Sequence, residues 1–330
     1  MKKPIAILIS IVIAITLVSC GSGTEAYSRT GLNLGTVITV TIYGGNGNVT
    51  LDRIFDEIER LESILSKSID TSDISRINQA AGEAPVALQS ETIAVLVESL
   101  RFYEISNGYF NIAIGPLVEL WGIGTENAAV PNENDIMTAL SLVDLGNLAI
   151  QGDTAGLLEK GMSLDTGGIA KGYIADRVAE ITKAEGCSGA LINLGGNVLT
   201  VGKKPDGSKW KIGIQDPFEP TGEYMQVVQV DEMSVVTSGP YERNFQENGI
   251  TYHHILDPFT GYPVANNIAG VTVICEKSID GDGLSTTVFA LGAEAGIAVI
   301  ENIENTECYI ILDDGEILMS SGFGEYLVLK

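Results

Sequence analysis

Apolar residues recur along the chain at two spacings, which predict helices in some stretches and strands in others. Between Leu51 and Leu65 they recur every three or four positions, the spacing of a helix with one buried face. Between Leu34 and Tyr43 the β-branched residues alternate with others, as in a half-buried strand. The same criteria predict further helices over residues 92–105, 136–142, 169–184, 283–291 and 293–300, and further strands over residues 191–194, 210–214, 226–230, 234–237, 269–275 and 308–312.

The order of these elements indicates the fold class. Short strands are mixed with helices, without the strict alternation that is typical of a parallel sheet. This order favours an α+β or mixed α/β fold. No repeat or long linker divides residues 34–330, so we expect one large domain or two closely packed ones.

The N-terminal residues predict the cellular compartment. Lys2 and Lys3 precede an apolar run over residues 5–18, which is shorter than the ~20 residues of a membrane-spanning helix and fits the core of a signal peptide. The run ends in Leu17-Val18-Ser19-Cys20, which resembles a bacterial lipobox. We therefore predict a leader over residues 1–19, lipidation of Cys20, and a lipidated tether over residues 20–33. The alternative is an ordinary signal peptide followed by an incidental cysteine.

The charge of the chain restricts its partners. Its formal net charge is -24. Because such a surface repels phosphate backbones, we expect no nucleic-acid partner. A dianionic substrate would need a cation or a lysine to neutralise it locally.

The cysteines beyond Cys20 point to no zinc site. Cys187, Cys275 and Cys308 are widely spaced and form no CxxC pair. Because apolar residues surround each of them, we interpret them as buried free thiols. A single disulfide is the alternative.

Residues 165–176 form the first of three segments with candidate chemistry. Gly167 and Gly168 stand directly before a predicted helix, where backbone N–H groups are free to meet an anion. Lys171 lies in the first turn of that helix, where a cation is poorly matched to the helix dipole unless it faces a phosphate. The alternative is a glycine-capped turn with a surface lysine.

The second segment combines residues 237–243, with the sequence Thr-Ser-Gly-Pro-Tyr-Glu-Arg, and residues 253–263, which contain the two histidines of the chain. His253 and His254 precede a turn over residues 257–261 with the sequence Asp-Pro-Phe-Thr-Gly. A histidine is a natural acceptor for the proton of a hydroxyl nucleophile, so His254 is a candidate general base. The alternative is a histidine that caps the turn.

The third segment, residues 280–287, carries candidate metal ligands. Asp282 and Thr286 are four residues apart and share one face if they lie on a helix. A carboxylate and a hydroxyl suit Mg²⁺, which prefers oxygen ligands and keeps water or phosphate in its shell. The alternative is that Asp282 caps the start of a helix.

Together these segments resemble the ApbE family of FAD:protein FMN transferases. The resemblance extends from about Leu34 to Gly324, and its specificity comes from many ordered matches. These are Gly35-Thr36, Ser72 to Asn78, Gly108 to Asn111, Trp121-Gly122, Asp165 to Asp176, Asn193 to Asn197, Thr237 to Gly239, His254 to Pro263, and Asp282 to Thr286.

The resemblance implies an α+β fold with mixed, largely antiparallel sheets flanked by helices. It also implies a site in which the diphosphate of FAD lies at Mg²⁺. His254 would stand beside the reacting phosphate. Leu34 departs from the methionine that the family often has before Gly-Thr. By position, the metal ligands would be Asp282, Thr286 and the carbonyl of Gly168, and the FAD contacts would be Asn78, Trp121, Gly122, Asp165, Lys171, His254 and Ile255.

The implied activity is Mg²⁺-dependent transfer of FMN from FAD to a Thr or Ser hydroxyl, with release of AMP. The implied acceptors are flavoprotein subunits of membrane redox complexes that carry the motif Asp-x-x-[Ser/Thr]-Gly-Ala-[Ser/Thr], which these 330 residues lack. With Cys20 lipidated, the enzyme would be anchored to the extracytoplasmic face of the cell membrane. An FAD pyrophosphatase and a non-catalytic flavin-binding lipoprotein are the alternatives.

Overall fold

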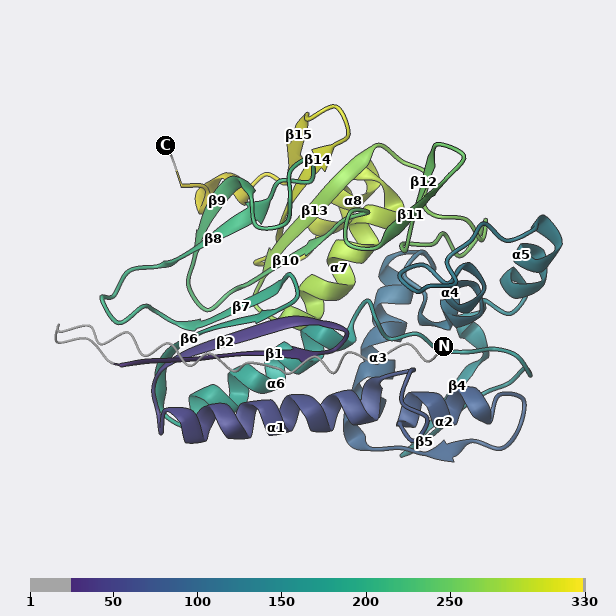
Figure 1. Cartoon of the computed structure of the whole chain (residues 1–330), viewed down its shortest axis with the longest axis horizontal. Helices are drawn as coiled ribbons and strands as arrows, with labels where there is room; N and C mark the ends of the chain where they lie inside the picture. Colours follow the sequence, from purple (N-terminus) through teal and green to yellow (C-terminus); the bar gives the residue numbers. More distant parts are fainter. Residues whose placement is uncertain (1–24, 329–330) are drawn as a thin grey trace, which may run out of the picture.

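An eight-stranded antiparallel sheet forms the centre of the computed structural model, which describes residues 25–328 (Figure 1). The predicted leader and the lipidation site Cys20 lie outside the described residues. Within the described part, no helix has both the length and the apolar character needed to cross a bilayer. In spatial order the strands are β1 (Ala26–Asn33), β2 (Thr36–Gly44), β6 (Cys187–Leu194), β7 (Asn197–Gly202), β10 (Ser234–Ser238), β13 (Ile268–Cys275), β14 (Glu307–Leu312) and β15 (Ile317–Met319).

Helices cover one face of this sheet and enclose the main core. α1 (Asn48–Leu65) and α6 (Ala170–Ala184) lie along the β1 to β7 half of the sheet (Figure 1). α7 (Ser278–Leu291) packs against β10, β13 and α6, and α3 (Ser90–Ile105) packs against α7. α8 (Ala293–Ile300) follows α7 and contacts β14. The apolar stripe of α1 is fully buried in this core, as its spacing predicts.

A hairpin covers the opposite face of the sheet. It consists of β8 (Trp210–Gln215) and β9 (Tyr224–Val230), which pair antiparallel. Their apolar side chains form a second cluster with the outward residues of β13 and β14 and with Phe323. β13 is therefore buried on both faces at all eight of its positions.

A smaller group of elements lies beside the sheet and carries the third apolar cluster. α4 (Gly115–Trp121) packs against α5 (Glu133–Leu140), with Leu256 beside them. The remaining elements are α2 (Asp73–Gln79), the three-stranded sheet β3 (Val86–Ala87), β5 (Thr154–Leu157) and β4 (Leu148–Gln151), the hairpin β11 (Asn244–Glu247) and β12 (Ile250–His253), and short 3-10 helices over Ile112–Ile114, Leu145–Asn147 and Phe323–Tyr326.

The predicted fold class is confirmed, and two of the differences from the predicted elements concern β1 and α7. Residues 26–33, which the sequence assigned to a tether, form the edge strand β1. Its Ser, Thr and Gly residues hide the strand pattern because an edge strand needs fewer buried side chains. Helix α7 begins at Ser278, five residues before the predicted start at Gly283. Its early glycines resemble a turn in the sequence but serve close packing, since a Cβ on Gly283 would meet Phe102.

The three described cysteines are free thiols. Cys275 and Cys308 are buried, and Cys187 is half-buried. The interpretation as free thiols is confirmed, and residues 25–328 contain no disulfide. Burial raises the pKa of Cys308 to about 12, so this thiol is unreactive.

Candidate active site

Helices α6 and α7 hold each other by hydrogen bonds in both directions. The backbone N–H of Gly172 on α6 donates to the Asp282 carboxylate on α7 at 2.9 Å. In return, the Asp176 carboxylate on α6 accepts from the backbone N–H groups of Ser278 and Ile279 at 2.8 and 2.9 Å. The helices approach closely because position 172 is glycine: a Cβ there would lie 2.6 Å from Cα of Ile279.

The three predicted metal ligands are brought together beside this contact. Asp282 is 2% exposed, and Thr286 follows it by one turn on the same helix. A Cβ on Gly168 would lie 3.6 Å from the Thr286 hydroxyl, so the loop before α6 faces this turn of α7. The alternative that Asp282 caps a helix is wrong, because α7 begins four residues earlier, at Ser278.

The chemistry of this set fits Mg²⁺. It offers one carboxylate, one hydroxyl and one backbone carbonyl, all of them oxygen donors. Within residues 25–328 no group of three or more His, Cys, Asp or Glu residues could hold a metal. The three oxygens of this set would fill only part of an octahedral Mg²⁺ shell, so water or the phosphate oxygens of a substrate would complete it.

Lys171 lies beside the Asp282 carboxylate at the start of α6. Its Nζ atom lies 3.5 Å from Oδ1 of Asp282 and donates to the Gly167 carbonyl at 3.3 Å. The N–H of Gly172, one of the amides at the start of α6, is likewise taken by Asp282. The N-terminus of α6 therefore orients the Asp282 carboxylate, and Lys171 lies half-buried beside that carboxylate.

Asn78 and Asp165 belong to a network that fixes the loop before α6. Both ends of the Asn78 amide bind the backbone of Leu164: Oδ1 accepts from its N–H at 2.7 Å, and Nδ2 donates to its carbonyl at 3.0 Å. The Asp165 carboxylate pairs with Lys67 at 2.7 Å and accepts from the Gly167 N–H at 2.8 Å. Asn78 therefore positions the segment that carries Asp165 and Gly168.

His254 is held so that one ring nitrogen is a free base. Its Nδ1 atom lies 3.3 Å from the carbonyl oxygen of Arg243, which also accepts from the His254 backbone N–H at 3.1 Å. A carbonyl oxygen can only accept, so Nδ1 carries the proton and Nε2 keeps its lone pair. Burial and, to a smaller extent, the positive charge of Arg243 lower the pKa of His254 to about 4. The imidazole is therefore neutral near pH 7.

His253 has different surroundings and different partners. Its Nε2 atom lies 3.1 Å from the carbonyl oxygen of Val264, and its ring packs edge-on against Phe289 at 5.5 Å. The turn after both histidines is held by Asp257, whose Oδ1 accepts from the Phe259 N–H at 2.7 Å. The alternative that a histidine caps this turn is therefore wrong.

Trp121 is placed to support this turn and has no surface for a ligand. It is fully buried, and its indole N–H donates to the Gly261 carbonyl at 2.8 Å. The rings of Tyr252 and Tyr262 pack against it at 5.4 and 5.8 Å. Of the predicted FAD contacts in this region, Gly122 is half-buried. Ile255 is 8% exposed.

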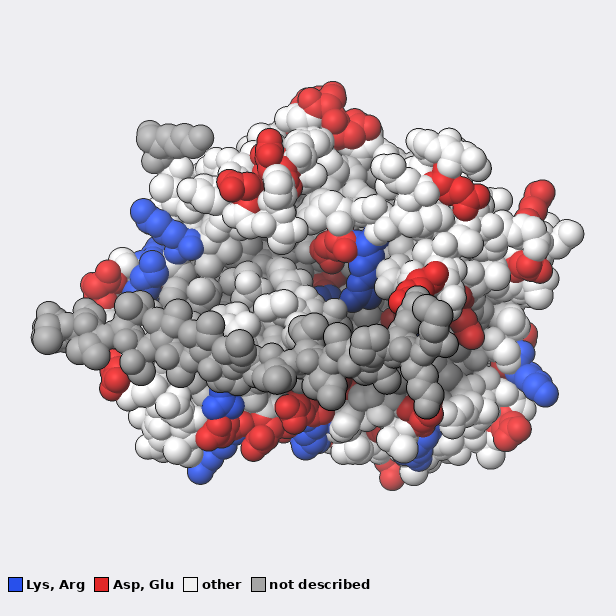
Figure 2. All heavy atoms as spheres, viewed as in Figure 1, with Lys and Arg blue, Asp and Glu red and all other residues white. Residues whose placement is uncertain are grey.

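Two charged residues of the site received no role from the sequence. Glu242 and Arg243 lie between β10 and β11. Near the middle of the face that Figure 2 shows, acidic and basic side chains lie close together. The pKa of Glu242 is raised, mainly by burial. The Lys171 cation opposes this shift and the Asp282 carboxylate adds to it, so the three charged groups lie in one region. Both belong to the segment 237–243 that the sequence singles out, but only the folded arrangement shows what they contact.

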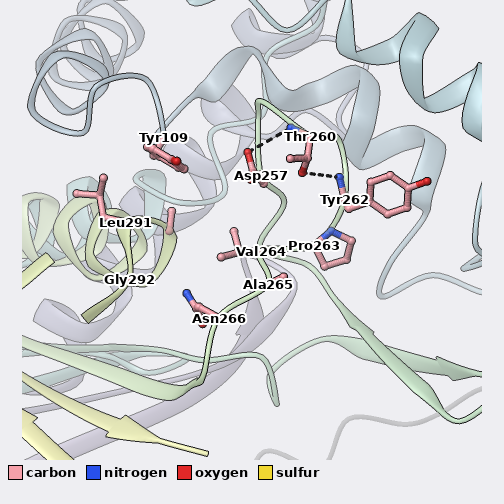
Figure 3. A pocket seen from close by; sticks show the side chains of 11 residues that line it. Tyr109, Asp257, Thr260, Tyr262, Pro263, Val264, Ala265, Asn266, Leu291 and Gly292 are labelled. Carbon is pink, nitrogen blue, oxygen red and sulfur yellow. Dashed lines mark hydrogen bonds between the residues drawn. The ribbon is translucent and has the colours of Figure 1, made fainter. Parts of the chain in front are cut away.

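A pocket of about 460 Å³ lies beside the turn that follows the histidines (Figure 3). Residues 257–266 form one wall, and Tyr109 and the end of α7 form the other. None of the predicted metal ligands or FAD contacts lines it. The pocket is therefore separate from the group around Lys171 and Asp282.

Comparison with known proteins gives one consistent family. The model of the ApbE family matches residues 34–310. A Klebsiella pneumoniae protein named FAD:protein FMN transferase is 37% identical over 302 residues, which cover 91% of this chain and 93% of that protein. A protein of the same name from Treponema pallidum is 34% identical over 325 residues, which cover 92% of this chain and 90% of that protein.

Solved structures agree with the sequence comparisons. The crystal structure of the ApbE protein from Thermotoga maritima matches with a TM-score of 0.85 and 30% identity, covering 92% of this chain and all of that chain. The flavin transferase ApbE from Vibrio cholerae matches with a TM-score of 0.83 and 28% identity over the same shares. The similarity therefore extends over almost all of the described fold.

Proposed function

The chain belongs to the ApbE family, and we propose that it transfers FMN from FAD to a hydroxyl side chain of an acceptor protein, with release of AMP. The observation that carries the proposal is a meeting of two features. The first is a set of oxygen donors (Gly168, Asp282 and Thr286) that lies beside Lys171. The second is His254, whose Nε2 is unprotonated and whose pKa is lowered by burial and also by the charge of Lys171. A reaction between a hydroxyl and a diphosphate needs these two features, a cation site and a base.

The oxygen set supports Mg²⁺ as the metal. Asp282, Thr286 and the Gly168 carbonyl would hold it, and Gly172 would keep the Asp282 carboxylate in place. When bound, Mg²⁺ neutralises charge on the diphosphate oxygens of FAD. Lys171 supplies a further positive charge within the same region, which matters because the chain as a whole carries -24.

The bond changes in this proposal balance without a redox partner. Nε2 of His254 accepts the proton of the acceptor hydroxyl, and the hydroxyl oxygen forms a bond to the phosphorus on the FMN side. The bond between that phosphorus and the bridging oxygen breaks, and AMP leaves with the electron pair. The pKa of about 4 describes the protein without FAD, and the negative diphosphate raises the basicity of Nε2 when it binds.

One incubation tests this function against its two alternatives. The protein is incubated with FAD, Mg²⁺ and a peptide carrying the motif Asp-x-x-Thr-Gly-Ala-Thr, and the products are read by mass spectrometry. A peptide that gains FMN, together with free AMP, is the expected result. Free FMN and AMP with an unchanged peptide would identify an FAD pyrophosphatase, and unchanged FAD would identify a flavin-binding protein.

We also propose that the protein is a lipoprotein anchored to the extracytoplasmic face of the cell membrane, near flavoprotein subunits of membrane redox complexes. The support is the sequence around Cys20, which lies outside the described residues. Mass spectrometry of the mature N-terminus tests it, because the protein should begin at an acylated Cys20. A Cys20→Ser variant that still carries an N-terminal lipid would contradict this assignment.

A further inference from the structure

Arg243 lies where two distant turns of the chain meet. It follows β10 and precedes β11. A Cβ on Gly35, in the turn between β1 and β2, would lie 3.6 Å from its Nη2 atom. A Cβ on Gly124, in the loop after α4, would lie 3.1 Å from its Cδ atom. Small residues at both positions leave room for the arginine side chain.

The charge of Arg243 is unpaired, which is unusual in this chain. Among the described residues, six of the seven arginines form an ion pair with Asp or Glu, and Arg243 is the exception. A chain with 43 acidic residues offers carboxylates over most of its surface. An arginine that pairs with none of them is available to bind an anion from outside the protein.

Arg243 is also tied directly to the candidate base. Its carbonyl oxygen accepts from the backbone N–H of His254 and from Nδ1 of the same residue. After burial, the charges of Arg243 and Lys171 both contribute to the lowered pKa of His254, so both cations lie near its ring. Of the two, Lys171 lies near a carboxylate, at 3.5 Å from Asp282, and Arg243 has no such partner.

We propose that the guanidinium group of Arg243 binds the diphosphate of the dinucleotide substrate while its carbonyl oxygen orients His254. This inference rests on the proposed function. A guanidinium group presents two parallel N–H donors that match two oxygens of a phosphate. One residue then holds the anion with its side chain and the base with its backbone, and so sets the position of one relative to the other.

Binding measurements on Arg243→Gln and Arg243→Lys test the proposal. The ligands are FAD, ADP and riboflavin, and Arg53→Gln is the matched control because Arg53 forms an ion pair with Glu185 on the surface. For Arg243→Gln the Kd of FAD and of ADP should rise about 10- to 100-fold, as expected for a lost charge-assisted contact. The Kd of riboflavin, which has no phosphate, should not change. Arg243→Lys should weaken FAD binding less than Arg243→Gln does, because lysine keeps the positive charge but lacks the two parallel N–H donors.

The outcomes separate this inference from the proposed function. Equal weakening of riboflavin and FAD would make Arg243 structural, and unchanged FAD binding with slower transfer to the peptide would assign the guanidinium to the acceptor. Either result overturns the inference and leaves the function standing. Failure of the unaltered protein to bind FAD would overturn both. If Arg243→Gln does not fold, Arg243→Lys still decides, since only a phosphate contact predicts a larger loss for FAD and ADP than for riboflavin.

Discussion

Asp282 on α7 and Gly172 on α6 are joined by a hydrogen bond of 2.9 Å from the glycine N–H to the carboxylate. The donor lies in the first turn of α6, at the helix N-terminus, where the helix dipole favours a negative charge. It orients the proposed metal ligand before any metal arrives, and it leaves Oδ1 facing Lys171. The structural role of Asp282 and its proposed role as a metal ligand can be separated by the choice of substitution.

Asp282→Asn should abolish FMN transfer and leave the fold nearly intact. The amide oxygen can still accept from Gly172, but the neutral side chain is a poor Mg²⁺ ligand. Asp282→Ala should also abolish transfer and should in addition lose about 1–3 kcal/mol of stability, because the Gly172 N–H is left without a partner. Calorimetric titration with Mg²⁺ and urea unfolding measure the two effects. Normal transfer by a folded Asp282→Asn variant would remove this residue from the metal site.

Gly172→Ala should destabilise the protein strongly. The new Cβ would clash with the Ser278 carbonyl, and backbone cannot move aside as a flexible side chain can. We expect a loss of about 1–3 kcal/mol or more, the range for overpacked sites. Gly324→Ala is the control, since a Cβ there meets nothing within 4 Å. Equal urea midpoints for the two variants would mean that the space between α6 and α7 at Gly172 admits a methyl group.

His254→Ala should slow transfer by about 10²- to 10⁴-fold, the usual cost of losing a general base, with a much smaller change in the Kd of FAD. His253→Ala should mainly lower the melting temperature, because His253 packs against Phe289 and binds the Val264 carbonyl. Rates and melting curves of both variants provide the comparison. Similar, small rate losses in the two would mean that His254 is structural.

The pH dependence of stability should carry the signature of His254. Its pKa is about 4 in the folded state and near 6.5, the ordinary value, in the unfolded state. The unfolded state therefore binds the proton more readily, and this contribution to stability is lost as the pH falls from about 6.5 to 4. His254→Ala should flatten the curve over that range. An unchanged curve would mean that the histidine is solvated.

Asp176 should act in the opposite direction. Burial raises its pKa to about 6 against the lowering effect of two backbone donors, so the folded state binds the proton more readily than the unfolded state does. Its contribution to stability therefore falls as the pH rises from about 3.8 to 6. Asp176→Asn should remove that slope. It also replaces one of the two carboxylate oxygens, which accept from the N–H groups of Ser278 and Ile279, by an NH₂ group that cannot accept. A slope that persists in unfolding measurements on Asp176→Asn would assign it to another carboxylate.

Local pattern was enough to find six of the eight described α-helices and about half of the strands, and distant contacts explain part of what it missed. The helix over residues 169–184 and the strand over residues 269–275 both agree with the structure, because the first has one apolar face and the second is a short run that is buried throughout. β1 was missed because an edge strand in this chain has few apolar residues. The early turn of α7 was missed because its glycines serve packing against other elements.

The same distinction holds for the site. The spacing of Asp282 and Thr286 was sufficient to place them on one helical face. By contrast, Lys67 and Arg243 became relevant only through partners more than ten residues away, Asp165 for the first and His254 for the second. The sequence shows that Asp165 and His254 belong to motifs, but it contains no signal that pairs Lys67 or Arg243 with them.

The contacts that build the site span long stretches of chain, and this affects the order of folding. Asn78 meets Leu164 across 86 positions, and Asp282 meets Gly172 across 110. Loop closure over such distances costs entropy before any contact forms, so proteins with many of them fold slowly. A chain that ends before α7 would lack both proposed side-chain metal ligands and the acceptor of the Gly172 amide. During synthesis, the capacity to bind FAD should therefore arise only after nearly the whole domain has emerged and closed.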